Sequence, residues 1–268
     1  MSESHLFEPN KAAMHPESVT SNDIEGWEEK IFQAWYARQS EPITKVIREI
    51  MVKEPTSDRE RLYNLFCLAY LYAQRTQIRK QRQAKDFLRK KYADENAGFA
   101  LDDVDFQHQV VGFLDAIQNQ ELQDAFWSYF EERMRMAGNK PHEMRGAKKG
   151  ILGLREAMRI LRSDGFSIEL PTPEEDAHEK IDLFGEKNGE SYLFQIKTPS
   201  RGSSGNMQIV PASRWRELYA GEEIKKDQEE KYGAFLDAFE TRKRTSHKPL
   251  HALVMTIPNP LREGRAEN

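Results

Sequence analysis

The sequence predicts an α/β (α+β) protein in which an N-terminal all-helical module precedes a C-terminal α/β domain. Apolar residues in the first half recur every three or four positions, as on one face of a helix, and no segment there has a convincing strand pattern. The second half contains short apolar runs separated by turn residues, in the order α-β-β-β-α-β. We therefore expect a disordered lead-in over 1–20, a helical module over 21–140 and the α/β domain over 141–268.

The helical module carries a start or stop signal for each of its helices. The expected starts are a cap at Ser21, Asn22 or Asp23, Pro42, a cap at Ser57 or Asp58, residue 102 and residue 119. The helix that begins at 57–58 is expected to stop near 96–98. The last helix is expected to end at Gly138, because a glycine that follows a helix adopts the left-handed conformation easily.

The α/β domain begins with a helix and ends with an apolar strand. Its expected elements are a helix over 142–163, strands over 166–170, 180–185 and 191–197, a charged helix over about 221–243 and a strand over 250–257. The segment MQIV, which follows the loop RGSSGN, gives no clear signal. Because RGSSGN lacks the GK[ST] ending of a phosphate-binding P-loop, we expect only a flexible loop there.

The stretch KIDLFGEKNGESYLFQIKT predicts a hairpin that brings polar residues together. Asn188 and Gly189 favour a two-residue type I′ turn, because both central residues of that turn need positive φ. That turn places Asp182 opposite Gln195, with Cβ atoms about 4.5–5.5 Å apart. Lys197 lies two residues beyond Gln195 and therefore on the same face. The apolar residues expected on the other face are Ile181, Leu183, Phe194 and Ile196.

An acid, an amide oxygen and a lysine on one sheet face can act together in a metal-dependent reaction. A carboxylate and a second oxygen donor can share a hard divalent cation such as Mg²⁺. The cation can polarise a phosphodiester, and the lysine can orient water or offset negative charge. Asp182, Gln195 and Lys197 are also ordinary residues for a solvent-facing hairpin, and that interpretation stays open from the hairpin alone.

With the element order, the acid on the second strand and x-Lys on the third, the chain resembles the PD-(D/E)xK nuclease superfamily, which has the restriction-endonuclease-like fold. The resemblance covers about 142–258 and gives the helical module no counterpart. It implies that Asp182 and Gln195 bind Mg²⁺ (or Mn²⁺) and that Lys197 is the catalytic lysine. It also implies an auxiliary acid on the preceding helix, matched by Glu156, for which an ordinary surface acid is the alternative.

The chain departs from the family pattern at two positions. Gln195 stands where the family usually has Asp or Glu, and a neutral amide is a weaker ligand than a carboxylate. Ile181 precedes Asp182, where proline is common. These departures leave open a nuclease fold that has lost its activity.

Basic residues are concentrated between Arg75 and Lys91, where eight of them accompany one acid. Such a stripe can neutralise phosphates, although a solvated helix face is the commoner role. The residues expected to contact nucleic acid are Arg79, Lys80, Arg82, Lys85, Lys148, Lys149 and Arg201.

Other candidate sites are weaker. The acids 174–176 can add a metal ligand, but a solvated acidic loop is the favoured interpretation. His247 and His251 do not have helical ligand spacing, because His251 opens a strand, and no second His or Cys pair supports zinc. Cys67 lies in an apolar run, which favours a buried, inert thiol.

The bulk properties point to a cytoplasmic protein. There is no apolar run of about 20 residues and no secretory signal pattern, and a single cysteine fits a reducing compartment. A net charge of −4 argues against a general nucleic-acid coat protein.

The sequence thus predicts a metal-dependent nuclease that acts on DNA, whose helical module aids substrate binding or contacts a second copy or another protein partner. The alternatives are a decayed nuclease-fold module that binds nucleic acid or a protein, and a helical structural or assembly protein.

Overall fold

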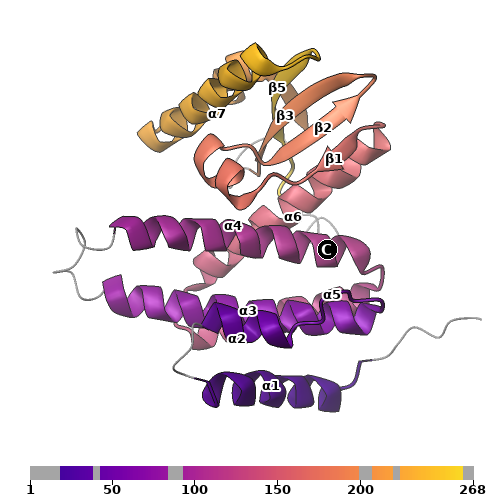
Figure 1. The fold of residues 1–268 in the computed structure, drawn as a ribbon, viewed down its shortest axis with the longest axis vertical. Helices are drawn as coiled ribbons and strands as arrows, with labels where there is room; N and C mark the ends of the chain where they lie inside the picture. The colour runs from indigo at the N-terminus through magenta and orange to yellow at the C-terminus, as the bar shows by residue number, and fades with distance from the viewer. Residues whose placement is uncertain (1–18, 39–42, 84–92, 199–206, 220–223, 262–268) are drawn as a thin grey trace, which may run out of the picture.

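The computed structural model describes residues 19–38, 43–83, 93–198, 207–219 and 224–261, and it has a mixed α/β fold (Figure 1). The helices are α1 (Ser21–Tyr36), α2 (Ile43–Ile50), α3 (Asp58–Gln83), α4 (Ala93–Ala116), α5 (Gln120–Met136), α6 (Pro141–Ser163) and α7 (Lys226–Thr245), with a π-helix η2 (Glu175–Glu179) and a 3₁₀-helix η3 (Ala212–Tyr219). The strands are β1 (Ser167–Glu169), β2 (Leu183–Lys187), β3 (Glu190–Lys197), β4 (Gln208–Pro211) and β5 (Leu250–Thr256). Within this described part, no helix is long and apolar enough to cross a membrane.

The five strands form one mixed sheet in the order β1-β2-β3-β5-β4. The β1-β2, β2-β3 and β4-β5 pairs are antiparallel, whereas β3 and β5 are parallel. One face packs on α6 through Leu183, Phe194 and Met255. The other face packs on α7 and η3, where Leu193 and Val254 share a cluster with their apolar side chains. The sheet is therefore covered by helices on both faces.

The β2-β3 hairpin has the predicted turn and register. Asn188 and Gly189 have φ values of 55° and 81°, as a type I′ turn requires. The paired residues run from Lys187 with Glu190 to Leu183 with Phe194. Because side chains alternate along each strand, this register puts the apolar and polar residues of β3 on opposite faces.

The register changes at Asp182, which is not part of the β2 ladder. Its N–H donates to the carbonyl of Phe194, the residue already paired with Leu183. Two residues thus oppose one, as in a β-bulge. As a consequence Ile181 packs with Leu193 in the cluster beneath α7. Its predicted place on the face of Leu183 and Phe194 was wrong.

Gly185 in β2 lies where no side chain fits. A Cβ there would meet Cε2 of Phe194 at 2.8 Å and Cδ1 of Phe166 at 3.3 Å. We expect Gly185→Ala to destabilise the protein by about 1–3 kcal/mol, because the rings must shift in a packed core. Thermal or denaturant unfolding measures this loss. Gly26→Ala in α1, where a Cβ meets nothing within 4 Å, is the matched control and is expected not to destabilise.

The helical half differs from the sequence prediction at three helix ends. The cap of α1 is Thr20, which forms a capping box with Asp23, so the predicted cap at 21–23 was wrong. Thr20 and Asp23 satisfy each other's N–H groups, which a cap inside the helix cannot do. The predicted stop near 96–98 and the predicted start at residue 102 were also wrong, because all of these residues lie inside α4.

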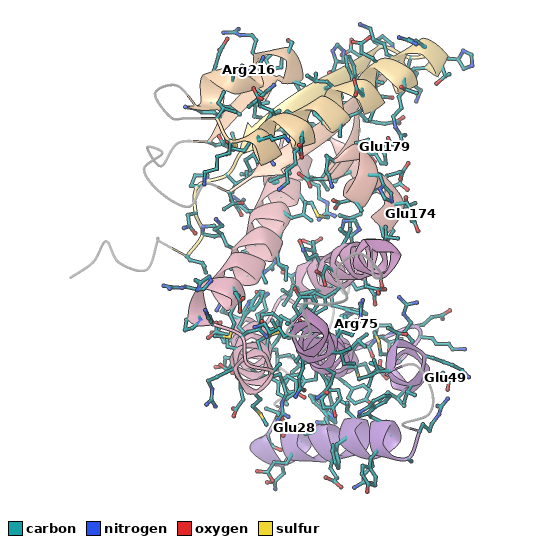
Figure 2. All side chains as sticks on the ribbon, turned by 90° about the vertical axis from the view of Figure 1, so that its left-hand side faces the viewer. Glu28, Glu49, Arg75, Glu174, Glu179 and Arg216 are labelled. Carbon is teal, nitrogen blue, oxygen red and sulfur yellow. The ribbon has the colours of Figure 1, made fainter. Side chains whose placement is uncertain are left out.

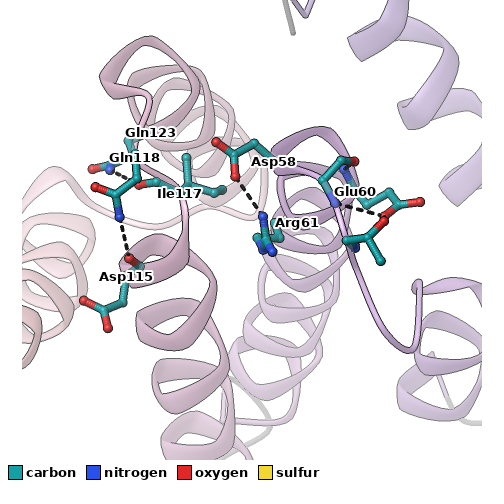
Figure 3. A network of polar contacts seen from close by, with 9 residues as sticks. Asp58, Glu60, Arg61, Asp115, Ile117, Gln118 and Gln123 are labelled. Carbon is teal, nitrogen blue, oxygen red and sulfur yellow. Dashed lines mark hydrogen bonds and ion pairs between the residues drawn. The ribbon is translucent and has the colours of Figure 1, made fainter. Parts of the chain in front are cut away.

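The junction between α4 and α5 is held by amide side chains (Figure 3). Nε2 of Gln123 donates to the carbonyl of Ile117 at 2.7 Å, and Gln118 donates to that of Asp115 at 3.4 Å. These bonds satisfy carbonyls that the end of α4 leaves without a helical partner. Arg155 of α6 donates in turn to Oε1 of Gln123 at 2.7 Å. The junction thus ties α6 to the helical half.

The apolar core continues across residue 140. One cluster of buried residues contains Phe66, Phe126 and Phe130 of the helical half together with Leu154 of α6 and Phe194 of β3. In Figure 1, α4 lies directly beneath the sheet-containing half, and α6 lies between the two. Residues of α4 therefore lie close to the segment that precedes β2.

Candidate metal and phosphodiester site

Asp182 is held at the start of the hairpin by its own side chain. Oδ2 accepts a hydrogen bond from the N–H of Ile196, across on β3. The carboxylate therefore takes the place of a backbone acceptor at the bulge, and its orientation is fixed by the sheet. The sequence predicted that Asp182 and Gln195 lie opposite each other; the observed contact is with the next residue along, Ile196.

The pKa of Asp182 is raised to about 7. Burial is the largest cause, because it penalises the charged form, and the nearby carboxylate of Asp176 adds to it. Lys197 and the N–H of Ile196 act in the opposite direction but do not cancel the rise. A positive charge close to Asp182 would therefore lower its pKa and favour the ionised carboxylate.

Lys197 extends from the end of β3 towards α7. Its Nζ lies 5.2 Å from the centre of the Tyr232 ring. Burial lowers the pKa of Lys197, and the positive charges of Lys231 and Lys180 lower it further, whereas Asp182 raises it. Asp182 and Lys197 therefore affect each other's pKa.

Gln195 is only 2% exposed, and its Oε1 has no hydrogen-bond partner among the described residues. Leaving a buried acceptor unsatisfied costs about 1–3 kcal/mol, so such an atom needs an explanation. Gln195 lies two residues before Lys197 and therefore on the same side of β3. A buried amide oxygen without a partner, one residue from the N–H that binds the Asp182 carboxylate, fits a cation that prefers oxygen ligands. No group of three or more His, Cys, Asp or Glu side chains suited to a metal occurs in the described ranges.

Glu156 of α6 is engaged by its own helix. Its two oxygens accept from Nε and Nη2 of Arg159 at 2.8 and 2.6 Å, and this pairing lowers its pKa. Glu156 and Arg159 line a hollow together with Ile257 and Pro258, which follow β5. Since Ile257 donates to the carbonyl of Lys197 at 2.7 Å, the hollow is next to the end of β3, but Glu156 is already paired.

Three of the seven predicted nucleic-acid contacts have side chains that the structure describes. Lys80 donates to Glu143 at 2.9 Å, and Lys148 donates to Glu131 at 2.8 Å while it lies over the Trp127 ring. Burial lowers the pKa of Lys149. The side chains of Arg79 and Arg82 and the whole of Lys85 and Arg201 lie outside the described residues.

The acidic segment before β2 is not a solvated loop, so the favoured interpretation of residues 174–176 was wrong. It forms η2, which lies between α7 and α4; Figure 2 shows Glu174 and Glu179 there. Arg242 of α7 donates to Glu179 at 2.8 Å and to Glu175 at 2.7 Å. Asp176 contacts His108 of α4 instead, at 2.9 Å.

His108 gave no signal in the sequence. It is a lone histidine in a helix, and its contact with Asp176 spans 68 positions of the chain. The only sequence signal at this place was the run of acids, and its spacing does not show which acid faces inward.

No protein-family model, curated protein or solved structure matches the chain. Its function must therefore be inferred from the chemistry of the site: a carboxylate with a raised pKa, an unsatisfied amide oxygen and a lysine with a lowered pKa.

Proposed function

We propose that the protein is a divalent-metal-dependent nuclease of the PD-(D/E)xK type, which hydrolyses phosphodiester bonds in DNA. The observation that carries the proposal is the unsatisfied Oε1 of Gln195, which is buried on the same side of β3 as Lys197. Gln195 is next in sequence to Ile196, whose N–H binds the Asp182 carboxylate. A solvent-facing hairpin offers no reason to bury an amide oxygen without a partner.

The element order supports the restriction-endonuclease-like fold as part of the proposal. The elements α6, β1, β2, β3, α7 and β5 follow the order α-β-β-β-α-β. Asp182 precedes the second of these strands, and Gln195 and Lys197 lie on the third. An acid next to the second strand and a lysine on the third support the proposed fold.

Each side chain has a separate task in this reaction. Asp182 and Gln195 would hold Mg²⁺ or Mn²⁺, which supplies positive charge to the phosphate and makes water more acidic. Lys197 is half-buried, and its pKa is lowered by burial, so it can give up and regain a proton more readily than a surface lysine. The N–H of Ile196 keeps the Asp182 carboxylate in one orientation, which reduces the reorganisation needed when substrate binds.

A cleavage assay with plasmid, single-stranded and branched DNA, in Mg²⁺ or Mn²⁺ and in excess EDTA, tests the proposal. Cleavage that depends on the metal is the expected result. Metal-independent cleavage would contradict the role of Asp182 and Gln195.

The neutral Gln195 favours a second candidate function, a decayed nuclease fold that binds nucleic acid without cutting it. An amide oxygen contributes no charge to a cation, so affinity is lower than with two carboxylates. DNA binding without any cleavage in Mg²⁺ or Mn²⁺ would favour this second function.

The variant Gln195→Glu distinguishes a metal site of low affinity from the absence of a metal site. A carboxylate at this position adds charge to the metal site, so we expect Mn²⁺ to bind more tightly and cleavage to be retained or increased. Titration of Mn²⁺ against parent and variant measures this difference. Lower Mn²⁺ affinity in the variant would show that the oxygen of Gln195 does not face a cation.

The basic stripe at 75–91 is proposed to hold DNA. Changing Arg79, Lys80, Arg82 and Lys85 to Gln is expected to lower the affinity for DNA of any sequence and to flatten its salt dependence. Fluorescence anisotropy at several salt concentrations gives the slope, and single-turnover cleavage at saturating DNA is expected to stay similar. An unchanged slope would instead favour the helical half as a protein-contact surface.

A further inference from the structure

A hollow of about 610 Å³ lies where the end of α4, α6 and the segment after β5 meet. Its volume is in the range of about 300–1,000 Å³ that is usual for sites of small ligands. Its apolar lining residues are Leu152, Ile257, Pro258 and Pro260. Its charged lining residues are Asp115, Arg155, Glu156 and Arg159, of which Figure 3 shows Asp115 at the end of α4. The hollow therefore suits a ligand that has both an apolar and a charged part.

The arginines around the hollow outnumber the acids. Arg155, Arg159 and Arg162 are spaced by four and three residues and therefore lie on one face of α6. Arg162 pairs with Asp115, and Arg159 pairs with Glu156. Arg155 donates instead to a neutral amide oxygen of α5 at 2.7 Å. These three arginines and two acids thus leave one positive charge for an anionic ligand.

The Glu156 carboxylate occupies the place on Arg159 that a phosphate would take. Arg159 donates through Nε and Nη2 to the two oxygens of Glu156, at 2.8 and 2.6 Å. The same pair of donors binds two oxygens of a phosphate. The side chains of Arg159 and Glu156 are 67% and 37% exposed, so water screens the pair and it contributes little to stability. A phosphate can therefore displace Glu156 from Arg159 at small cost.

The hollow adjoins the end of β3, the strand that includes Lys197. The N–H of Ile257 donates to the carbonyl of Lys197 at 2.7 Å. On α6, Gly153 follows Leu152 of the hollow and packs against Thr198, and a Cβ at Gly153 would overlap Oγ1 of that threonine. The side chain of Lys197 extends towards α7 instead. A ligand in the hollow would thus lie next to the end of β3 and not on the lysine itself.

We propose that this hollow binds a nucleoside monophosphate, with its phosphate on Arg159 and Arg155 and its base and sugar against the apolar residues. A free nucleotide and the phosphorylated end of a DNA strand both present this group. A terminal phosphate has a charge of about −1.5 to −2 at pH 7, whereas a phosphodiester within a strand has a single negative charge, so two arginines favour the terminal group. The inference rests on the proposed nuclease function and deepens it, because a strand end bound here would place the adjoining nucleotides near the end of β3.

Fluorescence anisotropy with an internally labelled single-stranded oligonucleotide tests binding to a strand end. The full chain is titrated in EDTA at low salt against oligonucleotides with a 5′-phosphate, with a 3′-phosphate and with hydroxyl groups at both ends. A phosphorylated end is expected to bind roughly tenfold more tightly than the hydroxyl form, because hydrogen bonds to charged groups are the stronger ones. Calorimetric titration with deoxyadenosine monophosphate tests the free nucleotide.

The two measurements distinguish the sources of the ligand. Preference for one phosphorylated end assigns the hollow to strand ends, and binding of the free nucleotide without such a preference assigns it to nucleotides. Absence of both overturns the proposal. Inorganic phosphate is expected to bind more weakly than the nucleotide, and equal affinity would overturn the part assigned to the apolar residues.

The variant Arg159→Gln attributes the binding to the hollow and is expected to lose the preference for phosphate. Arg159→Lys keeps the charge but not the two fixed donors, so an intermediate affinity is expected. Arg214→Gln on η3 is the matched control, because Arg214 also donates through Nε and Nη2 to a glutamate three residues away, Glu217, and does not line the hollow. The control is expected to bind like the parent. An unchanged preference in Arg159→Gln would overturn the proposal.

Glu156→Gln is expected to have the opposite effect. It removes the carboxylate that competes for Arg159, so the nucleotide and the phosphorylated strand end are expected to bind more tightly than to the parent. A merely structural role of the pair predicts weaker binding in both Glu156→Gln and Arg159→Gln. Weaker binding in Glu156→Gln would therefore contradict displacement of the carboxylate by phosphate. Melting curves show that each variant is folded.

These measurements contain no divalent metal, so they do not depend on the proposed metal site. Metal-dependent cleavage by a protein that has no preference for a terminal phosphate and no affinity for the nucleotide would overturn the inference and leave the proposed function in place. Binding to the hollow without cleavage in Mg²⁺ or Mn²⁺ would support the inference and contradict the nuclease activity.

Discussion

Asp182→Ala is expected to abolish Mg²⁺- or Mn²⁺-dependent cleavage of DNA while the chain stays folded. The variant lacks the carboxylate that the sheet orients through the N–H of Ile196. Without this carboxylate, a cation at the site would lose its charged ligand and keep only the neutral oxygen of Gln195. Loss of a single preorganised electrostatic group commonly costs about 10²–10³ in rate, and loss of the metal itself costs more.

Asp182→Asn is the control for structural damage. Asparagine keeps an oxygen that can accept from the N–H of Ile196, so the bulge is preserved while the charge is lost. Both variants are expected to be inactive, with parent-like circular dichroism. Activity of Asp182→Ala equal to that of the parent, or equal cleavage by the parent in excess EDTA, would refute the metal-site proposal.

The hairpin shows how much a short sequence signal can determine. Asn188 and Gly189 fix the turn, and the turn fixes every pair from Lys187 with Glu190 to Leu183 with Phe194. Local backbone preference and alternation were sufficient for this, because both act over a few residues. The helix predicted over 142–163 is also present, as α6 (Pro141–Ser163).

The bulge at Asp182 could not be read from the same signals. Alternation predicts that Ile181 shares a face with Leu183, yet it packs beneath α7. The cause is a hydrogen bond between the side chain of Asp182 and the backbone of Ile196, which competes with the regular ladder. Periodicity contains no information about such a competition.

The contribution of the helical half was unpredictable for a different reason. His108 and Asp176 meet only because α4 packs beneath the sheet-containing half. Neither the lone histidine nor the acidic run has a spacing that indicates the other. Contacts between distant segments depend on the packing of whole elements, which pattern analysis of one sequence does not give.

Asp182 is also expected to make the metal-free protein less stable as the pH rises from about 4 to about 7. Its pKa is about 7 in the folded state, well above the 3.8 that is usual for an aspartate. Between these values the folded protein holds a proton that the unfolded chain releases, so ionisation favours unfolding. The free energy of unfolding therefore falls through this range and levels off above it, by an amount on the order of a few kcal/mol.

The measurement is the difference in unfolding free energy between parent and Asp182→Asn, from denaturant curves at several pH values in EDTA. Asparagine cannot ionise, so the variant is expected to gain stability relative to the parent as the pH rises, while the other titrating groups cancel. At pH 8, Mg²⁺ is expected to raise the melting temperature of the parent but not of the variant, because the cation favours the ionised carboxylate. Parallel pH profiles for the two proteins would mean that Asp182 has the same pKa in the folded and unfolded states. The raised pKa would then be contradicted, and with it the expected effect of Mg²⁺ on the ionisation of Asp182.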